Sequence, residues 1–253
     1  MWQTIVTSLA LIGMLAAMLL ALELGRRFGK RRMQQDATGA HSGNAALEGA
    51  VFGLLGLLIA FTFSGAANRF DARRELLLKE TNAIGTAWLR LDLLPGPAHR
   101  ELQEEFRRYV DQRLEATRAG AVRVDDALSA RQAQIWTIAV AAARDTGDLR
   151  VTQLLLPALN DMFDVATSRY MAVQTHPPGV IYAMLLLLSF VCAAMAGYSM
   201  AASRHRNWLH ILTFAGSLIF ALYVTLEIEF PRRGLIRLDR YDQVMVDLRT
   251  GMQ

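Results

Sequence analysis

The sequence predicts an all-α integral membrane protein with four transmembrane helices and a helical domain inserted between the second and the third. Hydrophobic residues make up 53% of the 253 residues and charged residues only 20%. The hydrophobic residues gather in four stretches of about 20 residues, the length that crosses a bilayer. Between the second and third stretches, apolar residues recur at helical spacing. No segment alternates with the period of two that is typical of a strand.

The first expected span covers residues 4–22, which carry no charge. Basic residues follow this span in the run GRRFGKRR at 25–32, whereas a cleaved signal peptide carries its basic residues in front. We therefore expect a retained transmembrane helix. The small polar residues at 34–46 are typical of a loop, so residues 1–67 should hold two spans joined by a basic connection.

The second expected span covers residues 47–67 and contains Gly49, Gly53 and Gly56. Small residues let another helix approach closely in a membrane. The partner is either another helix of the same chain or the same helix in a second copy of the protein. The sequence leaves both alternatives open.

One face of this second span has the composition expected of a pore helix. Leu54, Leu57 (or Leu58) and Phe61 recur at i, i+3/i+4 and i+7 and so share a helix face. Ser64 and Asn68 give the same stripe a polar end. Such a face, repeated around an axis by several copies, forms an apolar neck that gates by dewetting.

Residues 68–178 are predicted to form the helical domain outside the membrane. Its expected helices are 68–94, 98–118, 125–143 and 149–175, separated by Pro95-Gly96-Pro97 and by Gly120. Asp125 is the predicted N-cap of the third of these helices. Pro157 is a candidate interruption of the fourth.

The chain is expected to return to the membrane over residues 179–228. Uncharged residues at 180–200 form the third span, SRHRN at 203–207 forms a tight basic turn, and 207–226 form the fourth span. Pro231 and Gly234 then break the helix. The tail, residues 229–253, contains a short amphipathic segment that we expect to pack on the helical domain.

Basic residues predict the orientation in the membrane. The connection between the first two spans carries five arginines and lysines, and the turn between the last two carries Arg204 and Arg206. Short basic loops favour the cytoplasm. This rule places both termini and the helical domain outside the cytoplasm.

The sequence offers no pattern of catalysis. It lacks metal-ligand spacing, a phosphate-binding glycine loop and a nucleophile motif, so we expect no enzyme, no cofactor and no metal site. The basic excess is explained by membrane topology rather than by nucleic acid. Glu227, Glu229, Arg232 and Arg233 follow the fourth span, either as structural ion pairs or as a charged rim that attracts cations. The expected partners are the lipid bilayer, inorganic ions and further copies of the chain.

The run LLGLLIAFTFSGAANRFDARREL at 54–76 resembles the second span of bestrophin channels. In that family an apolar neck helix leads into an arginine-aromatic pair and an acidic-Ala-Arg pattern, which stand here as Arg69-Phe70 and Asp71-Ala72-Arg73. The segment 229–234, EFPRRG, is similar to the acidic-Pro-x-x-Gly opening of the bestrophin tail. The order of spans, domain and tail also agrees. The whole chain is most similar to bacterial bestrophin-like membrane proteins, which implies the bacterial inner membrane.

The resemblance implies a homopentamer around an ion-conducting axis that the second span lines. It assigns the neck to Phe61 and Leu57, with Gly53 or Leu54 as the third residue. Two departures bear on mechanism. Arginines follow Glu229 where animal bestrophins carry the acidic cluster that holds calcium, and bestrophins place the helical domain in the cytosol, opposite to the orientation that the basic loops predict.

Two functions from different classes therefore follow from the sequence. The first is a homo-oligomeric, pentameric ion channel whose pore is lined by the second span. The second is a non-conducting membrane sensor or scaffold whose helical domain binds a partner or ligand. A channel requires a continuous stripe with a polar end, whereas a scaffold requires glycine faces that close the bundle, and the sequence contains both features.

Overall fold

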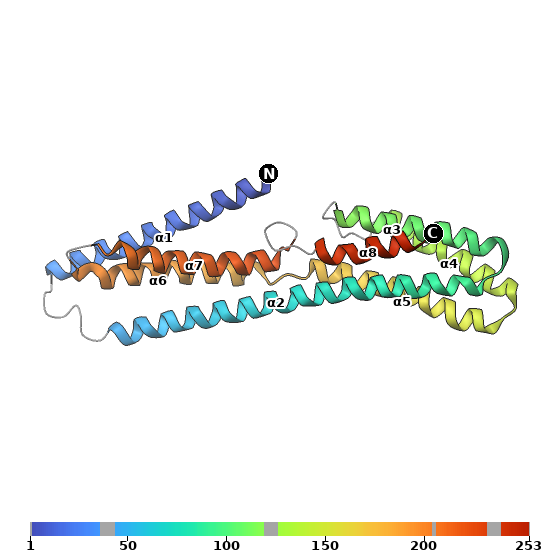
Figure 1. Ribbon diagram of the computed structural model, residues 1–253. Helices are drawn as coiled ribbons and strands as arrows, with labels where there is room; N and C mark the ends of the chain where they lie inside the picture. The colour runs from blue at the N-terminus through green and yellow to red at the C-terminus, as the bar shows by residue number, and fades with distance from the viewer. Residues whose placement is uncertain (1, 36–43, 119–125, 204–205, 232–238, 253) are drawn as a thin grey trace. The chain divides into compact units, whose positions relative to one another are not determined.

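The computed structural model describes residues 2–35, 44–118, 126–203, 206–231 and 239–252. All regular structure in these ranges is helical, with no strand among them (Figure 1). The predicted all-α fold is therefore confirmed. Four of the helices are long and apolar enough to cross a bilayer, so the chain is a multi-pass membrane protein. The expected turn at Gly120 and the N-cap Asp125 lie outside the described residues.

The chain divides into two compact units. The membrane unit contains residues 1–68 and 177–236, and the helical unit contains residues 69–176 and 237–253. Helix α2 (Asn44–Arg90) contributes its first part to the membrane unit and its second part to the helical unit.

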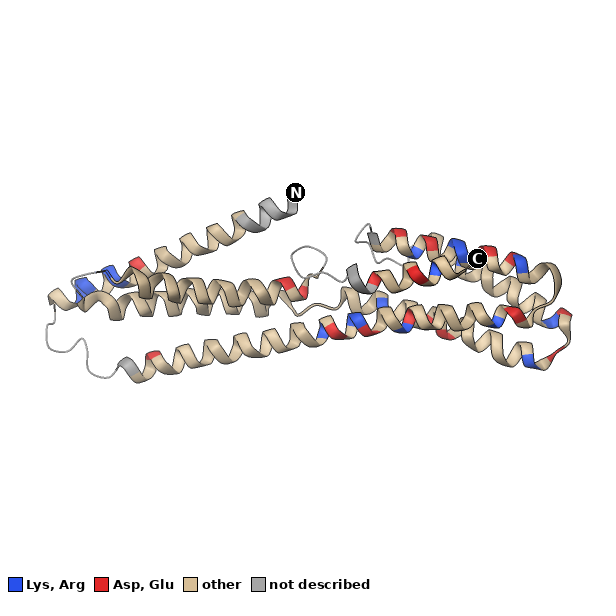
Figure 2. Cartoon of the chain, viewed as in Figure 1, with Lys and Arg blue, Asp and Glu red and all other residues tan. Residues whose placement is uncertain are grey.

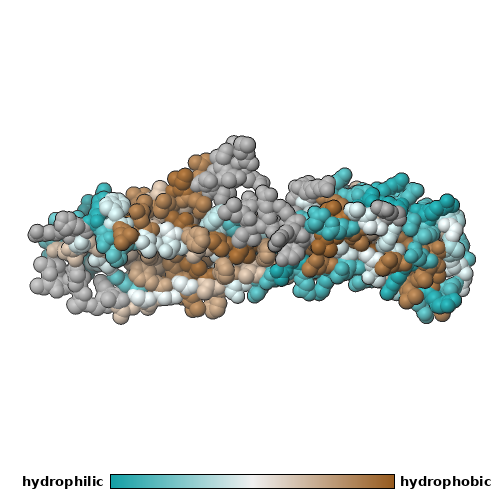
Figure 3. Space-filling model, viewed as in Figure 1, coloured by the Kyte–Doolittle hydropathy of each residue, from teal (hydrophilic) through white to brown (hydrophobic). Residues whose placement is uncertain are grey.

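Four helices supply the membrane unit. They are α1 (Trp2–Gln35), the first part of α2, α6 (Gly179–Ser199) and α7 (Trp208–Glu229), with a short 3-10 helix, η2 (Met200–Ala202), after α6. Figure 3 shows hydrophobic residues gathered on the surface of this unit. Helix α1 continues through the basic run that we expected to lie beyond the span, because arginine and lysine are good helix formers. Of the predicted loop at 34–46, residues 36–43 lie outside the described part of the chain.

Helices α1 and α6 cross in direct backbone contact. A Cβ added at Gly25 would overlap the carbonyl oxygen of Ala194, and one added at Gly197 would overlap that of Leu22. A Cβ at Gly29 would lie 2.6 Å from the Cβ of Ala201. These three glycines therefore make the close approach within the chain, as small residues do between membrane helices.

The helical unit is a bundle of the second part of α2, α3 (Gly96–Arg118), α4 (Asp126–Thr146), α5 (Leu149–Gln174) and α8 (Asp239–Gly251), with η1 (Leu91–Leu93) after α2. Helix α5 is continuous through Pro157, although proline lacks the N–H of one helical hydrogen bond. The expected interruption is not seen. Asp148 is the N-cap of α5 and accepts a hydrogen bond from the backbone N–H of Arg150 at 2.8 Å.

One large apolar core holds the bundle together, and the tail helix α8 completes it through Met245 and Met252, which are 2% exposed. Two polar contacts fix the tail in place. Arg249 forms a two-pronged ion pair with Asp111 at 2.8 and 2.9 Å, and Arg107 donates to the carbonyl oxygen of Met252 at 2.7 Å. The hydrogen bond to the Asp111 carboxylate raises the pKa of Arg249.

Candidate functional site

The first part of α2 turns one face toward the other helices of the membrane unit. Leu55 is 3% exposed and packs with Leu185, Cys192 and Leu222 of α6 and α7. Leu58 lies on this inward face, partly buried against the same cluster. Of the two alternatives left by the sequence, Leu58 thus faces the chain's own core, and Leu57 does not.

Polar contacts also fix this part of α2 against α6. The hydroxyl of Ser199 donates to Glu48 at 2.5 Å, at the beginning of α2. Further along, Phe52 meets Phe214 of α7 edge to face, with ring centroids 6.0 Å apart. The rotation of α2 about its own axis is therefore determined by contacts at several heights.

The predicted pore residues lie on the opposite face of α2. Leu54, Leu57 and Phe61 are 49%, 50% and 65% exposed, and Ser64 and Asn68 are exposed as well. An α-helix turns by about 100° per residue, so these five positions form one narrow stripe. Among the described residues, the chain's other helices leave about half or more of the Leu54, Leu57 and Phe61 side chains uncovered.

The glycines of α2 border this stripe. A Cβ added at Gly49, Gly53 or Gly56 would meet no atom within 4 Å. They differ in this respect from Gly25 and Gly197, where the chain's own backbone fills the space. The α2 glycines therefore make no close packing within the chain.

Two of the predicted rim charges, Glu227 and Glu229, lie in the last turn of α7. Glu229 is fully buried and Glu227 is 8% exposed, and Glu227 accepts a hydrogen bond from the hydroxyl of Tyr223. Arg232 and Arg233 lie outside the described residues. The two glutamates are thus part of the packed interior of the membrane unit.

The arginine of the acidic-Ala-Arg pattern has a role that sequence reasoning missed. The neighbouring Arg74 pairs with Asp71 at 3.3 Å on the exposed surface of α2. Arg73 is instead 4% exposed and donates to the carbonyl oxygens of Ala172 and Thr175, at 3.1 and 2.9 Å. An arginine on the last carbonyls of a helix stabilises its C-terminus. Arg73 therefore caps α5 where the chain leaves the helical unit.

Comparison with known protein families matches residues 12–241 to the Bestrophin-like domain. The chain belongs to the bestrophin-like family. The family resemblance stated from the sequence is therefore confirmed, and the matched range includes the stripe on α2 and the Arg73 cap. No curated protein and no solved structure matches this bestrophin-like chain.

Proposed function

We propose that this bestrophin-like protein is a homo-oligomeric ion channel whose pore is lined by the exposed stripe of α2. The observation that carries the proposal is the orientation of this helix. Leu54, Leu57 and Phe61 are exposed, while Leu55, about 100° around the helix from Leu54, is buried in the membrane unit and Leu58 is partly buried against the same cluster. A face that the chain's own helices leave open is the face that an axis of symmetry can use.

The composition of the stripe favours a pore over contact with lipid. Ser64 and Asn68 continue the apolar positions in the same direction along the helix. Lipid offers no partner to a hydroxyl or an amide, whereas a water-filled pore does. Rings of Leu57 and Phe61 restrict the pore by dewetting, and Ser64 and Asn68 line its polar end.

The glycines of α2 provide a surface on which a second copy of the chain can pack. Gly49, Gly53 and Gly56 are open on the surface of α2 beside the stripe. Small residues allow the neighbouring copy to approach closely enough to close a ring. The pentameric number follows from the family resemblance.

Cysteine accessibility along α2 tests the proposal. In a Cys192→Ala background, which removes the protein's one cysteine, Leu57→Cys and Ser64→Cys are treated with charged thiol reagents during ion-flux measurements in liposomes. Modification should reduce flux at both positions. Adducts of opposite charge at Ser64→Cys should affect flux differently, which reports the sign of the permeant ion.

Phe63→Cys is the matched control for this experiment. Phe63 is also exposed, at 42%, but lies about 200° around the helix from Phe61. The thiol reagent should leave the ion flux of the Phe63→Cys variant unchanged. Equal effects at Phe63→Cys and Leu57→Cys, or no effect at any position in a protein that conducts, would place the pore elsewhere.

A further inference from the structure

A pocket of about 240 Å³ lies in the membrane unit between α1 and the beginning of α7, away from the stripe on α2. It is lined by residues of two kinds. Leu19, Leu22, Trp208 and Ile211 form an apolar part, and Glu23, Arg26, Arg27 and Arg206 form a charged part. Figure 2 shows basic residues gathered on α1 in its later part.

The charged part of the pocket is incompletely satisfied within the chain. Arg26 is only 5% exposed and donates from Nη2 to the carbonyl oxygen of Ser203 at 3.0 Å. Its Nε is buried and has no hydrogen-bond partner among the residues that the structure describes. A buried donor without a partner is unfavourable, so an acceptor that enters the pocket would stabilise this guanidinium.

The charge of the lining points to an anion. Glu23 pairs with Arg27 at 3.0 Å and with Arg206 at 3.1 Å. Three arginines face this one carboxylate, so the lining keeps two positive charges. Arginine presents several donors in a planar fork, which suits the oxygens of a phosphate group.

The apolar part and the size of the pocket narrow the class of anion. Trp208 is half exposed and packs against the Arg206 guanidinium, 5.8 Å from its ring centroid. Tryptophan is typical of the membrane–water interface. The volume far exceeds the roughly 10–15 Å³ that one water needs but lies below the roughly 300 Å³ of the smallest drug-sized sites. A phosphate headgroup with the beginning of its acyl chains fits both parts.

We propose that this pocket binds the phosphate of an anionic phospholipid, with Arg26 and Arg206 as the recognising residues and Leu19, Leu22 and Ile211 against the acyl chains. Basic pockets between membrane helices bind anionic headgroups on the cytoplasmic side. The basic loops predict that the same end of the membrane unit faces the cytoplasm. The site is separate from the proposed pore and does not depend on conduction.

Lipid retention by the purified full-length protein tests this proposal. The protein is placed in nanodiscs of phosphatidylglycerol and phosphatidylcholine and the lipids that remain bound after detergent extraction are counted by native mass spectrometry. Phosphatidylglycerol should be retained over phosphatidylcholine by about 25-fold, at roughly fivefold for each of the two recognising arginines. Equal retention of the two lipids would overturn the proposal.

Three variants separate the pocket from general surface charge. Arg206→Gln should reduce the preference about fivefold, and since Arg206 is exposed this variant should fold normally. Glu23→Gln should strengthen the preference, because it removes the competing carboxylate, and misfolding cannot produce a gain. Arg31→Gln removes an exposed charge from α1 outside the pocket and should change nothing. An effect of Arg31→Gln as large as that of Arg206→Gln would contradict a specific site.

Soluble phosphate distinguishes a lipid site from a free-anion site. Inorganic phosphate and glycerol 3-phosphate at millimolar concentration should fail to displace phosphatidylglycerol, since they cannot use the apolar part of the pocket. Displacement by either compound would show that the pocket takes a free phosphate rather than a lipid.

Discussion

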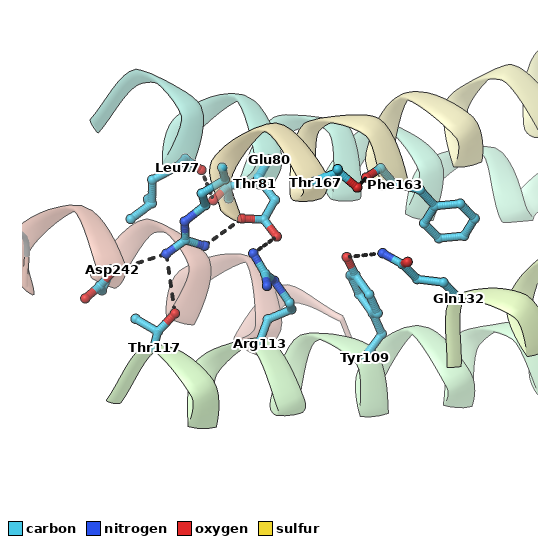
Figure 4. Close-up of polar contacts among 11 residues, drawn as sticks. Leu77, Glu80, Thr81, Tyr109, Arg113, Thr117, Gln132, Phe163, Thr167 and Asp242 are labelled. Atoms are coloured by element: carbon cyan, nitrogen blue, oxygen red, sulfur yellow. Dashed lines mark hydrogen bonds and ion pairs between the residues drawn. The ribbon is translucent and has the colours of Figure 1, made fainter. Parts of the chain in front are cut away.

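A fully buried glutamate joins two arginines from different helices at the centre of the helical unit. Glu80 of α2 lies 2.5 Å from Arg113 of α3 and 2.6 Å from Arg169 of α5, measured between side-chain oxygen and nitrogen. All three side chains are at most 3% exposed. Figure 4 shows the same network, with Thr117 and Asp242 in contact beside it. Glu80 and Asp242 together balance the charges of the two arginines, and charges inside a bundle are tolerated only when they are paired in this way.

Glu80→Gln should therefore strongly destabilise the helical unit. The variant removes the carboxylate that pairs with the buried Arg113 and leaves Arg169 with only the more distant Asp242, at 4.0 Å. Breaking a buried pair in this way costs about 3–5 kcal/mol. Urea unfolding followed by circular dichroism of the detergent-solubilised protein measures the effect. Glu75→Gln is the control, because Glu75 on the same helix pairs with Lys79 at the surface. This substitution should barely change the free energy of unfolding. Similar midpoints for the two variants would contradict this account of the core.

Tyr109 shows how strongly the same interior disfavours unbalanced charge. Burial, reinforced by the Glu80 carboxylate, raises the pKa of Tyr109 to about 12, and Gln132 donates to its hydroxyl at 3.4 Å. The phenol is therefore neutral over the whole physiological range. The sequence alone could not show which charges of this domain are buried. Glu80, Arg113 and Arg169 lie far apart in the sequence, and only the bundle brings them together.

At the scale of elements, two sets of glycines in the membrane unit have different uses. Gly25 and Gly197 lie where α1 and α6 touch through their backbones, whereas Gly53 on α2 is open. The sequence predicted that glycines on the second span served close packing, and left open whether the partner was within the chain. It did not single out Gly25 or Gly197, because no pattern in one helix reveals which residue of another it meets.

Gly25→Ala and Gly53→Ala should consequently have opposite effects on folding and assembly. Alanine at position 25 overlaps the Ala194 carbonyl, and such overpacking costs about 1–3 kcal/mol or more, so the yield of folded chain should fall several-fold. Alanine at position 53 meets nothing in the chain and should leave that yield unchanged while weakening the oligomer. Fluorescence-detected size exclusion separates the two readouts. Normal yield from Gly25→Ala would show that α1 and α6 are not in backbone contact.

Most helices could be predicted from the sequence because residues close to each end determine where the helix begins or stops. The starts of α3 and α5 and the end of α6 follow from proline, glycine and apolar runs, and the structure agrees with them closely. We expected a loop from residue 34 and gave Pro157 as a candidate interruption, but α1 extends to Gln35 and α5 passes through Pro157. In both cases packing against neighbouring helices stabilises the helix through a segment whose local sequence favours a helix end.

At the scale of the whole molecule, orientation in the membrane is the prediction with the widest consequences. The basic connections place the helical unit outside the cytoplasm, whereas the bestrophin resemblance places it inside. A Ser129→Cys variant in the Cys192→Ala background provides the test, because Ser129 is exposed on α4. An impermeant thiol reagent should label it in spheroplasts before lysis. Labelling that requires lysis would restore the bestrophin orientation.

The exposed stripe illustrates what sequence periodicity can and cannot predict at this scale. Helical spacing was enough to group Leu54, Leu57, Phe61, Ser64 and Asn68 on one face. Which direction that face points depends on contacts such as Leu55 with Leu185 and Phe52 with Phe214, which lie about 130 or more residues away along the chain. The structure supplies this direction, and the proposal of a pore rests on it.

The most direct test of the proposed channel is a planar-bilayer recording of the purified protein beside Phe61→Ala and Phe63→Ala in asymmetric salt. Both substitutions remove an exposed phenylalanine from the same helix, but only Phe61 belongs to the stripe. Phe61→Ala should widen the neck and raise conductance severalfold, while Phe63→Ala should conduct as the unmodified protein does. The reversal potential gives the sign of the permeant ion. Silence from all three as intact oligomers, or an equal increase in both variants, would contradict a pore along this face of α2.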